Sequence, residues 1–149
     1  QVCVDDRAHA QEHSLEVQLP FLQSVLDEFK LIPLLIGNAS PDRVRQLLQQ
    51  VWGDDDTLIV VSSDLSHYQD YATAQARDHH TCQAIESLQD QSIGYEDACG
   101  CIPVRALLLA AKEQGLRAST VALCNSGDTA GDRSRVVGYG SWVFHHVEH

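Results

Sequence analysis

The apolar run Thr57–Val61 constrains the fold of this chain more than any other feature of the sequence. A short, uncharged run of this kind is typical of a strand buried in a sheet. The polar segment Ser62–Tyr68, of sequence SSDLSHY, follows it directly. Because ligand sites in open α/β sheets lie just beyond the ends of such strands, the sequence predicts a functional loop at Ser62–Tyr68.

The rest of the chain alternates between helical and strand patterns. Apolar residues at helical spacing predict helices over 14–29, with a bend at Pro20, and over 41–51, 71–88 and 103–112. Short apolar runs predict strands over 31–36, where Pro33 indicates an edge or a bulge, and over 57–61, 120–123 and 136–144. This order predicts an α/β fold with a mainly parallel or mixed central sheet and helices on both faces.

Length and charge limit the classes of protein and partner. The 149 residues are near the commonest domain size, so we expect residues 1–149 to form a single domain. A net charge of −11 without a Lys/Arg cluster argues against nucleic acid and anionic membranes as partners. The five cysteines form no CxxC pair, which favours a reducing, cytoplasmic setting. The chain contains no Met, from which we expect that a segment was removed from its start, and part of any active site is then open to lie outside these residues.

Asp64, His67 and Cys99 are the candidate site residues. A carboxylate and an imidazole three residues apart can share one substrate or metal ion, and Cys99 offers a thiolate to the same crevice. The structural alternatives stay open: Asp64 caps its own turn, His67 is an ordinary surface histidine, and Cys99 and Cys101 pack at the start of a helix.

Other polar segments carry weaker signals. His13 precedes a helix and either faces a cleft or belongs to a solvated cap. The segment 125–135 is predicted to be a hairpin-like loop whose two acids and two arginines either pair with each other or line a pocket mouth. No site is assigned to the remaining histidines considered, which are His79, His80, His145, His146 and His149.

Four motifs together resemble the Memo family, whose bacterial and archaeal members are called AmmeMemoRadiSam system protein B. The motifs are EHSLEVQLPF at 12–21, SSDLSHY at 62–68, ACG at 98–100, and SGDT at 126–129 continuing to SRVVGYG at 134–140. The resemblance implies a class III extradiol dioxygenase-like fold. Those dioxygenases hold non-haem Fe(II) with two His and one Glu, and in Memo proteins a Cys stands in place of the Glu.

The resemblance assigns roles to three residues. It makes Cys99 the thiolate metal ligand, puts His67 at the position of the dioxygenase acid/base histidine, and puts Asp64 beside it. The family's two metal-binding histidines lie in N-terminal motifs that do not occur here. We therefore expect the chain to match only the C-terminal part of a Memo-like domain, and to hold Fe(II) or Cu only together with the missing N-terminal half.

Two functions from different classes follow. In the first, the chain belongs to a metal-dependent oxidoreductase in which Cys99 binds the metal, His67 moves a proton to or from substrate or oxygen, and Asp64 fixes the imidazole tautomer. Ring cleavage is not expected, because the third ligand has changed. In the second, the same crevice holds a peptide or small ligand without turnover. The bacterial family name also implies a radical-SAM system partner.

A third interpretation is that residues 1–149 lack independent activity, and it generates a prediction. Missing strands would leave an apolar sheet edge uncovered, so these residues alone are expected to purify with little metal and to form homo-oligomers. Gel filtration and metal analysis check this expectation. A monodisperse monomer with stoichiometric iron would contradict it.

Overall fold

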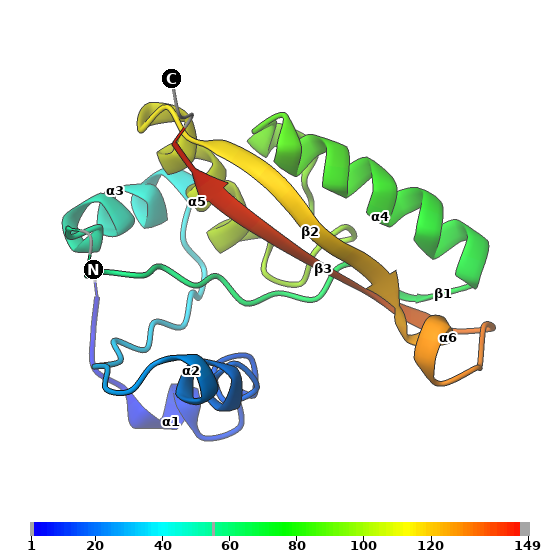
Figure 1. Ribbon diagram of the computed structural model, residues 1–149, viewed down its shortest axis with the longest axis horizontal. Helices are drawn as coiled ribbons and strands as arrows, with labels where there is room; N and C mark the ends of the chain where they lie inside the picture. Colours follow the sequence, from blue (N-terminus) through cyan, green and yellow to red (C-terminus); the bar gives the residue numbers. More distant parts are fainter. Residues whose placement is uncertain (1, 55, 147–149) are drawn as a thin grey trace. The chain divides into compact units, whose positions relative to one another are not determined.

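The computed structural model describes residues 2–54 and 56–146 (Figure 1). The chain divides into two compact units, residues 1–38 and residues 39–149. That residues 1–149 form one domain stays a prediction.

The first unit contains two short helices, α1 (Asp6–His9) and α2 (Leu19–Val25). The Asp5 side chain accepts a hydrogen bond from the backbone N–H of Arg7 and so caps α1. Helix α2 is shorter than the predicted 14–29 because Pro20, which has no N–H, lies in its first turn, where a proline is tolerated. The predicted strand over 31–36 is wrong, since no residue of this segment is in a strand.

The second unit contains a three-stranded sheet made of β1 (His67–Gln69), β2 (Arg117–Asn125) and β3 (Val136–His145), in the order β1-β3-β2. Both strand pairs are antiparallel, so the prediction of a mainly parallel or mixed sheet is wrong. The segment between β2 and β3 is too short for the crossover that a parallel pair requires. It forms a hairpin connection instead, as the turn-rich sequence over 125–135 predicts.

The predicted helices of the second unit are confirmed. They are α3 (Pro41–Val51), α4 (Tyr71–Glu86) and α5 (Cys101–Glu113), and two short helical turns, η1 (Asp90–Ser92) and α6 (Ser126–Thr129), accompany them. Ser40 and Asp70 cap α3 and α4 by accepting hydrogen bonds from the N–H groups of Arg43 and Thr73. These caps explain why both helices begin where the sequence indicates.

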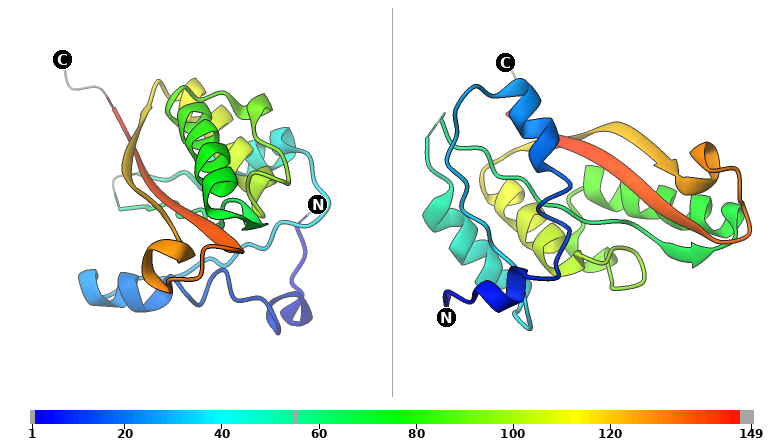
Figure 2. Two further views of the ribbon diagram at one scale, coloured as in Figure 1. Left: turned by 90° about the vertical axis from the view of Figure 1, so that its right-hand side faces the viewer. Right: turned by 90° about the horizontal axis from the view of Figure 1, so that it is seen from below.

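Helices α4 and α5 lie along one face of the β2–β3 hairpin (Figure 2). The core between them contains Ala84, Ile85, Ile93, Ala98, Cys101 and Leu108, with Ala118, Trp142 and Phe144 packed against it from the strands. Val121 and Val143 are 65% and 53% exposed, so the hairpin carries apolar side chains outside this core as well.

The segment Thr57–Val61 is not a strand, which corrects the expectation on which the functional loop was first placed. Leu58 is 70% exposed and Val60 is 46% exposed. An apolar run becomes a buried strand only where neighbouring strands offer hydrogen bonds, and no described residue pairs with 58–61 in a sheet.

Among the described residues, none of the helices combines the length and the apolar character that a membrane crossing requires.

Leu108 tests the α4–α5 core. Its side chain is fully buried, so Leu108→Ala is expected to lower the free energy of unfolding by about 2–5 kcal/mol. Val25→Ala, at a side chain that is 76% exposed, is expected to change it by less than about 0.5 kcal/mol. Urea unfolding followed by circular dichroism measures both. Equal effects of the two variants would contradict the assigned core.

Candidate functional site

Strand β3 fixes the loop that leads into β1. The backbone N–H of Leu65 donates to the carbonyl of Gly138 at 2.9 Å, and the N–H of Gly138 donates to the carbonyl of Ser66 at 2.9 Å. Leu65 and Ser66 are both buried. The predicted functional loop is therefore anchored in its middle, with Asp64 and His67 on either side of the anchor.

Cys99 reaches the same loop through a reciprocal pair of hydrogen bonds with Asp64. The N–H of Cys99 donates to the carbonyl of Asp64 at 3.2 Å, and the N–H of Asp64 donates to the Cys99 sulfur at 3.2 Å. A donor of this kind stabilises a sulfur that carries negative charge. The exposed Cys99 precedes α5, whose N-cap is Gly100.

Ser63 holds the Cys99 segment in place. Its hydroxyl donates to the carbonyl of Asp64 at 2.7 Å and accepts from the N–H of Gly100 at 2.9 Å. The same oxygen lies 3.5 Å from the Cys99 sulfur. A Cβ on residue 100 would lie 2.9 Å from the Cβ of Ser63, so the close approach of the two segments requires glycine there.

His67 completes the cluster. Its Nε2 lies 3.5 Å from Oδ2 of Asp64, and the two side chains are 33% and 49% exposed. Tyr68 follows with a φ of 58°, a left-handed conformation that non-glycine residues seldom adopt. The ring of Tyr68 meets the His67 ring edge-on, with centroids 5.7 Å apart. The tyrosine ring thus lies directly beside the imidazole.

The ligand atoms of Asp64, His67 and Cys99 all lie within 4.8 Å of one another. The second unit thus brings together all three residues that the sequence singles out. Because metal–ligand bonds are about 2.0–2.3 Å long, the donors must approach one another before one ion can reach them all. Among the described residues, no other set of three His, Cys, Asp or Glu side chains is grouped in this way.

Tyr139 is a further residue beside the anchoring glycine that the sequence reasoning did not single out. It follows Gly138 on β3 and pairs across the hairpin with Cys124. Burial, followed by the negative charges of Asp64 and Cys124, raises the pKa of the Tyr139 phenol. Its phenol therefore stays protonated near Asp64 at neutral pH. Its position next to a glycine in the VVGYG motif is the one signal that could have pointed to it.

Cys101 packs at the start of a helix, which is the structural alternative given above for this residue. It is 1% exposed and belongs to the core, and burial raises the pKa of its thiol. Only Gly100 lies between the exposed Cys99 and this buried cysteine, yet the two thiols differ in exposure and in role. The CGC sequence alone does not distinguish them.

The polar segment around His13 lies in the first unit. His13 pairs with Glu16, and its side chain is 76% exposed, which agrees with a solvated cap. The neighbouring Glu12 accepts from the N–H of Ser14 at 2.8 Å, and this hydrogen bond holds the pKa of Glu12 below its usual value.

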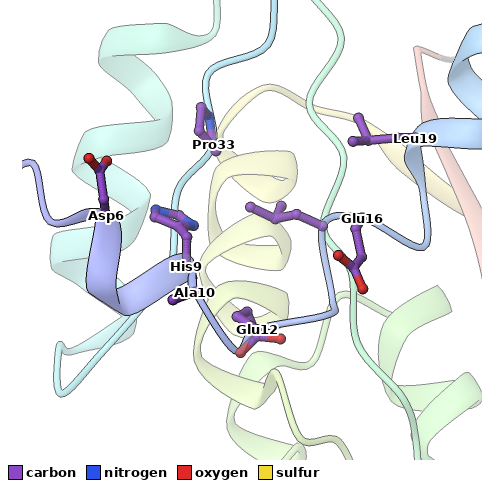
Figure 3. A pocket seen from close by; sticks show the side chains of 8 residues that line it. Asp6, His9, Ala10, Glu12, Glu16, Leu19 and Pro33 are labelled. Carbon is purple, nitrogen blue, oxygen red and sulfur yellow. The ribbon is translucent and has the colours of Figure 1, made fainter.

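A pocket in the first unit is lined mainly by acidic and apolar side chains (Figure 3). The lining residues are Asp6, His9, Ala10, Glu12, Leu15, Glu16, Leu19 and Pro33. None of the predicted site residues is among them.

The loop over 125–135 uses its charged residues to hold its own shape. Asn125 and Asp128 form a capping box on α6, and the Tyr71 hydroxyl donates to Asp128 at 2.6 Å. This hydrogen bond raises the pKa of Tyr71 and lowers that of Asp128. The Arg133 guanidinium lies 4.3 Å from the centroid of the Tyr71 ring. These contacts tie the loop to the start of α4.

The remaining histidines lie away from the cluster. His79 and His80 are exposed on α4, and His145 and His146 are exposed at the end of β3. His149 lies outside the described residues.

The fold and the cluster define an α/β protein in which a small antiparallel sheet and the segment before α5 bring a thiol, an imidazole and a carboxylate together. Residues 2–143 match the family model described as Memo-like protein. The chain belongs to the Memo family.

Curated relatives share about a third of their aligned residues with this chain. A MEMO1 family protein of Aquifex aeolicus is 36% identical over 94% of the chain and 57% of its own length. Those of Sulfolobus acidocaldarius and Metallosphaera sedula are 35% and 33% identical, over 91% and 93% of the chain and 52% and 53% of their own lengths. The chain thus spans about half the length of the curated relatives it matches.

Ser63 offers a test of the contacts that hold Cys99. Ser63→Ala removes the acceptor of the Gly100 N–H and is expected to lower the free energy of unfolding by about 1–3 kcal/mol. It is also expected to change the rate at which iodoacetamide alkylates Cys99. The control is Ser119→Ala, whose hydroxyl lies 2.9 Å from Nε2 of the exposed His145. Wild-type stability and alkylation rate in Ser63→Ala would contradict the assigned contacts.

Proposed function

We propose that Asp64, His67 and Cys99 form part of a non-haem metal site for Fe(II) or Cu in a Memo-family protein with an oxidoreductase role. The observation that carries this proposal is the convergence of three different donor atoms within 4.8 Å. Cys, His and Asp side chains with purely structural roles each form their own hydrogen bonds. In a metal site, by contrast, their ligand atoms must converge on one ion. An oxidoreductase without ring cleavage agrees with a thiolate in the ligand set.

The donor set fits a first-row transition metal. Thiolate and imidazole are preferred by Cu, Fe and Zn, whereas Mg²⁺ and Ca²⁺ prefer oxygen donors alone. With Cys99 as the thiolate ligand and His67 kept for proton transfer, coordination positions stay open for a small molecule. When bound, the metal would supply redox chemistry or polarise a substrate at this point.

The protein groups around the cluster can hold and move a proton. His67 is exposed enough to exchange a proton with a substrate or with water, and Asp64 at 3.5 Å from Nε2 can orient the ring. The N–H of Asp64 stabilises charge on the Cys99 sulfur. Tyr139 adds a protonated phenol near Asp64.

Further ligands are proposed to come from the part of the longer relatives that this chain does not match. The relatives' additional length leaves room for the histidines that the family resemblance implies. We also propose that the complete domain has a class III extradiol dioxygenase-like fold, acts on a small molecule or oxygen in the cytoplasm, and works with a radical-SAM partner.

A non-catalytic scaffold is the second candidate. Tyr68 is 66% exposed beside His67, and the Arg135 guanidinium lies 5.0 Å from the centroid of its ring. An exposed aromatic ring with a cation beside it can bind a peptide or small ligand without turnover. This candidate predicts ligand binding that does not depend on metal.

Co(II) titration tests the metal site. Millimolar Co(II) is expected to give the wild-type protein a thiolate-to-metal charge-transfer band, even where metal is too weakly held to survive purification. Cys99→Ser removes the sulfur ligand and is expected to abolish the band. His67→Ala is expected to keep the band, because the sulfur ligand remains, and to weaken Co(II) binding by about tenfold or more, because the loss of a group beside a bound metal typically costs that much affinity.

Cys3→Ser is the matched control, because Cys3 is exposed but lies in the first unit. It is expected to leave the band and the affinity unchanged. A band that persists in Cys99→Ser, or no band in the wild-type protein, would overturn the proposal and favour the scaffold.

A further inference from the structure

Asp78 is a buried acid on α4 that makes contact with the site loop. Its side chain is 2% exposed, and its Oδ1 accepts a hydrogen bond from the N–H of Ser66 at 3.1 Å. We infer that Asp78 is a positioning residue, which sets the relative placement of Asp64, His67 and Cys99 by holding the peptide at Ser66. The inference rests on the proposed metal site.

Ser66 is the residue through which Asp78 affects the placement of the cluster. It is fully buried and lies between Asp64 and His67 in the loop. Its N–H is held by Asp78 and its carbonyl by the N–H of Gly138. Because both sides of the residue are held, the peptide planes on either side of Ser66 cannot rotate independently, and the next side chain, His67, has a fixed origin.

Strand β3 keeps the carboxylate in its place. A Cβ on residue 138 would lie 2.0 Å from Oδ2 of Asp78 and 2.5 Å from its Cγ. The Gly138 backbone therefore packs directly on the carboxylate, and only glycine permits this approach. The glycine that anchors Leu65 and Ser66 thus also encloses the acid that holds Ser66.

The energetic cost of Asp78 argues that the acid has a specific task. Its neighbours on the buried face of α4 include Ala74, Thr81, Cys82 and Ile85, so an apolar side chain would suit the position. A buried carboxylate is costly unless it is paired and hydrogen-bonded. In the described part of the chain, Asp78 forms no ion pair, and its Oδ2 has no hydrogen-bond partner.

Asp90 is a second buried acid, and its contacts differ from those of Asp78. It is 8% exposed, but its Oδ1 lies 3.8 Å from the ammonium of Lys112 and it is not part of the loop. Its role is accounted for by an ion pair between η1 and α5. Asp78 instead makes its hydrogen bond to the backbone between two candidate ligands, where a displacement of about 1 Å is enough to disturb a site.

The test compares Asp78→Ala, Asp78→Asn and Asp90→Ala by Co(II) titration, amide hydrogen exchange and thermal unfolding. Asp78→Ala removes the acceptor and is expected to weaken Co(II) binding about 10- to 100-fold and to speed exchange of the Ser66 amide. Asp78→Asn keeps an oxygen for Ser66 and is expected to stay within about threefold of wild type. Asp90→Ala is expected to lower the melting temperature without changing either readout.

Gly138→Ala is a second variant for the case in which Asp78→Ala does not fold. It keeps Asp78 in the chain, but the added Cβ overlaps the Asp78 carboxylate and displaces it. Gly138→Ala is therefore expected to weaken Co(II) binding and to speed exchange of the Ser66 amide. Wild-type Co(II) affinity and Ser66 exchange in a folded Asp78→Ala or Gly138→Ala protein would overturn the inference.

The two proposals fail in different ways. If Cys99→Ser abolishes the Co(II) band but Asp78→Ala does not weaken binding, the metal site stands and the positioning role is wrong. If no Cys99-dependent band exists, the metal site is wrong. Whether Asp78 positions the loop is then decided by the exchange of the Ser66 amide alone. Faster exchange in Asp78→Ala with wild-type exchange in Asp78→Asn supports the positioning role, and unchanged exchange in Asp78→Ala refutes it.

Discussion

The pairing of the site loop with Gly138 is the interaction on which the candidate site depends. Two backbone hydrogen bonds join Leu65 and Ser66 to one glycine of β3, and the Asp64–Cys99 exchange then attaches the segment before α5 to the same loop. Each bond contributes only about 1 kcal/mol net, but together they fix three peptide groups in a partly buried place. Side-chain positions at the cluster follow from this backbone frame.

Local patterns predicted the helices of the second unit well, because the information lies within each segment. Ser40 and Asp70 cap α3 and α4, and Gly115 follows α5 as expected. The sheet was predicted less well. Its strands near 120–123 and 136–144 were recognised, but the antiparallel arrangement depends on a hairpin connection that strand–helix alternation does not reveal. Thr57–Val61 shows the same limit, since an apolar run does not carry information about its partners.

The candidate site was found from residue types beyond an expected strand and then from the family motifs, although the expected strand and parallel sheet were wrong. Asp64, His67 and Cys99 do meet, yet they do so through backbone pairing with an antiparallel strand and not at the carboxyl edge of a parallel sheet. Tyr139 and Asp78 could not be found in the same way. Asp78 draws attention through its hydrogen bond to Ser66, which no spacing along the chain encodes, and Tyr139 only through its place beside Gly138.

The site's three segments lie far apart in the chain, which gives it an order of assembly. Asp64 and Cys99 are 35 residues apart, and Gly138 follows much later. Contacts of such long range form late in folding, because a large loop must close before they contribute. During synthesis, the thiol and the imidazole leave the ribosome before the strand that aligns them. The alignment of these donors is thus a property of the finished hairpin, and a stalled or truncated nascent chain would present the same groups separate and unaligned.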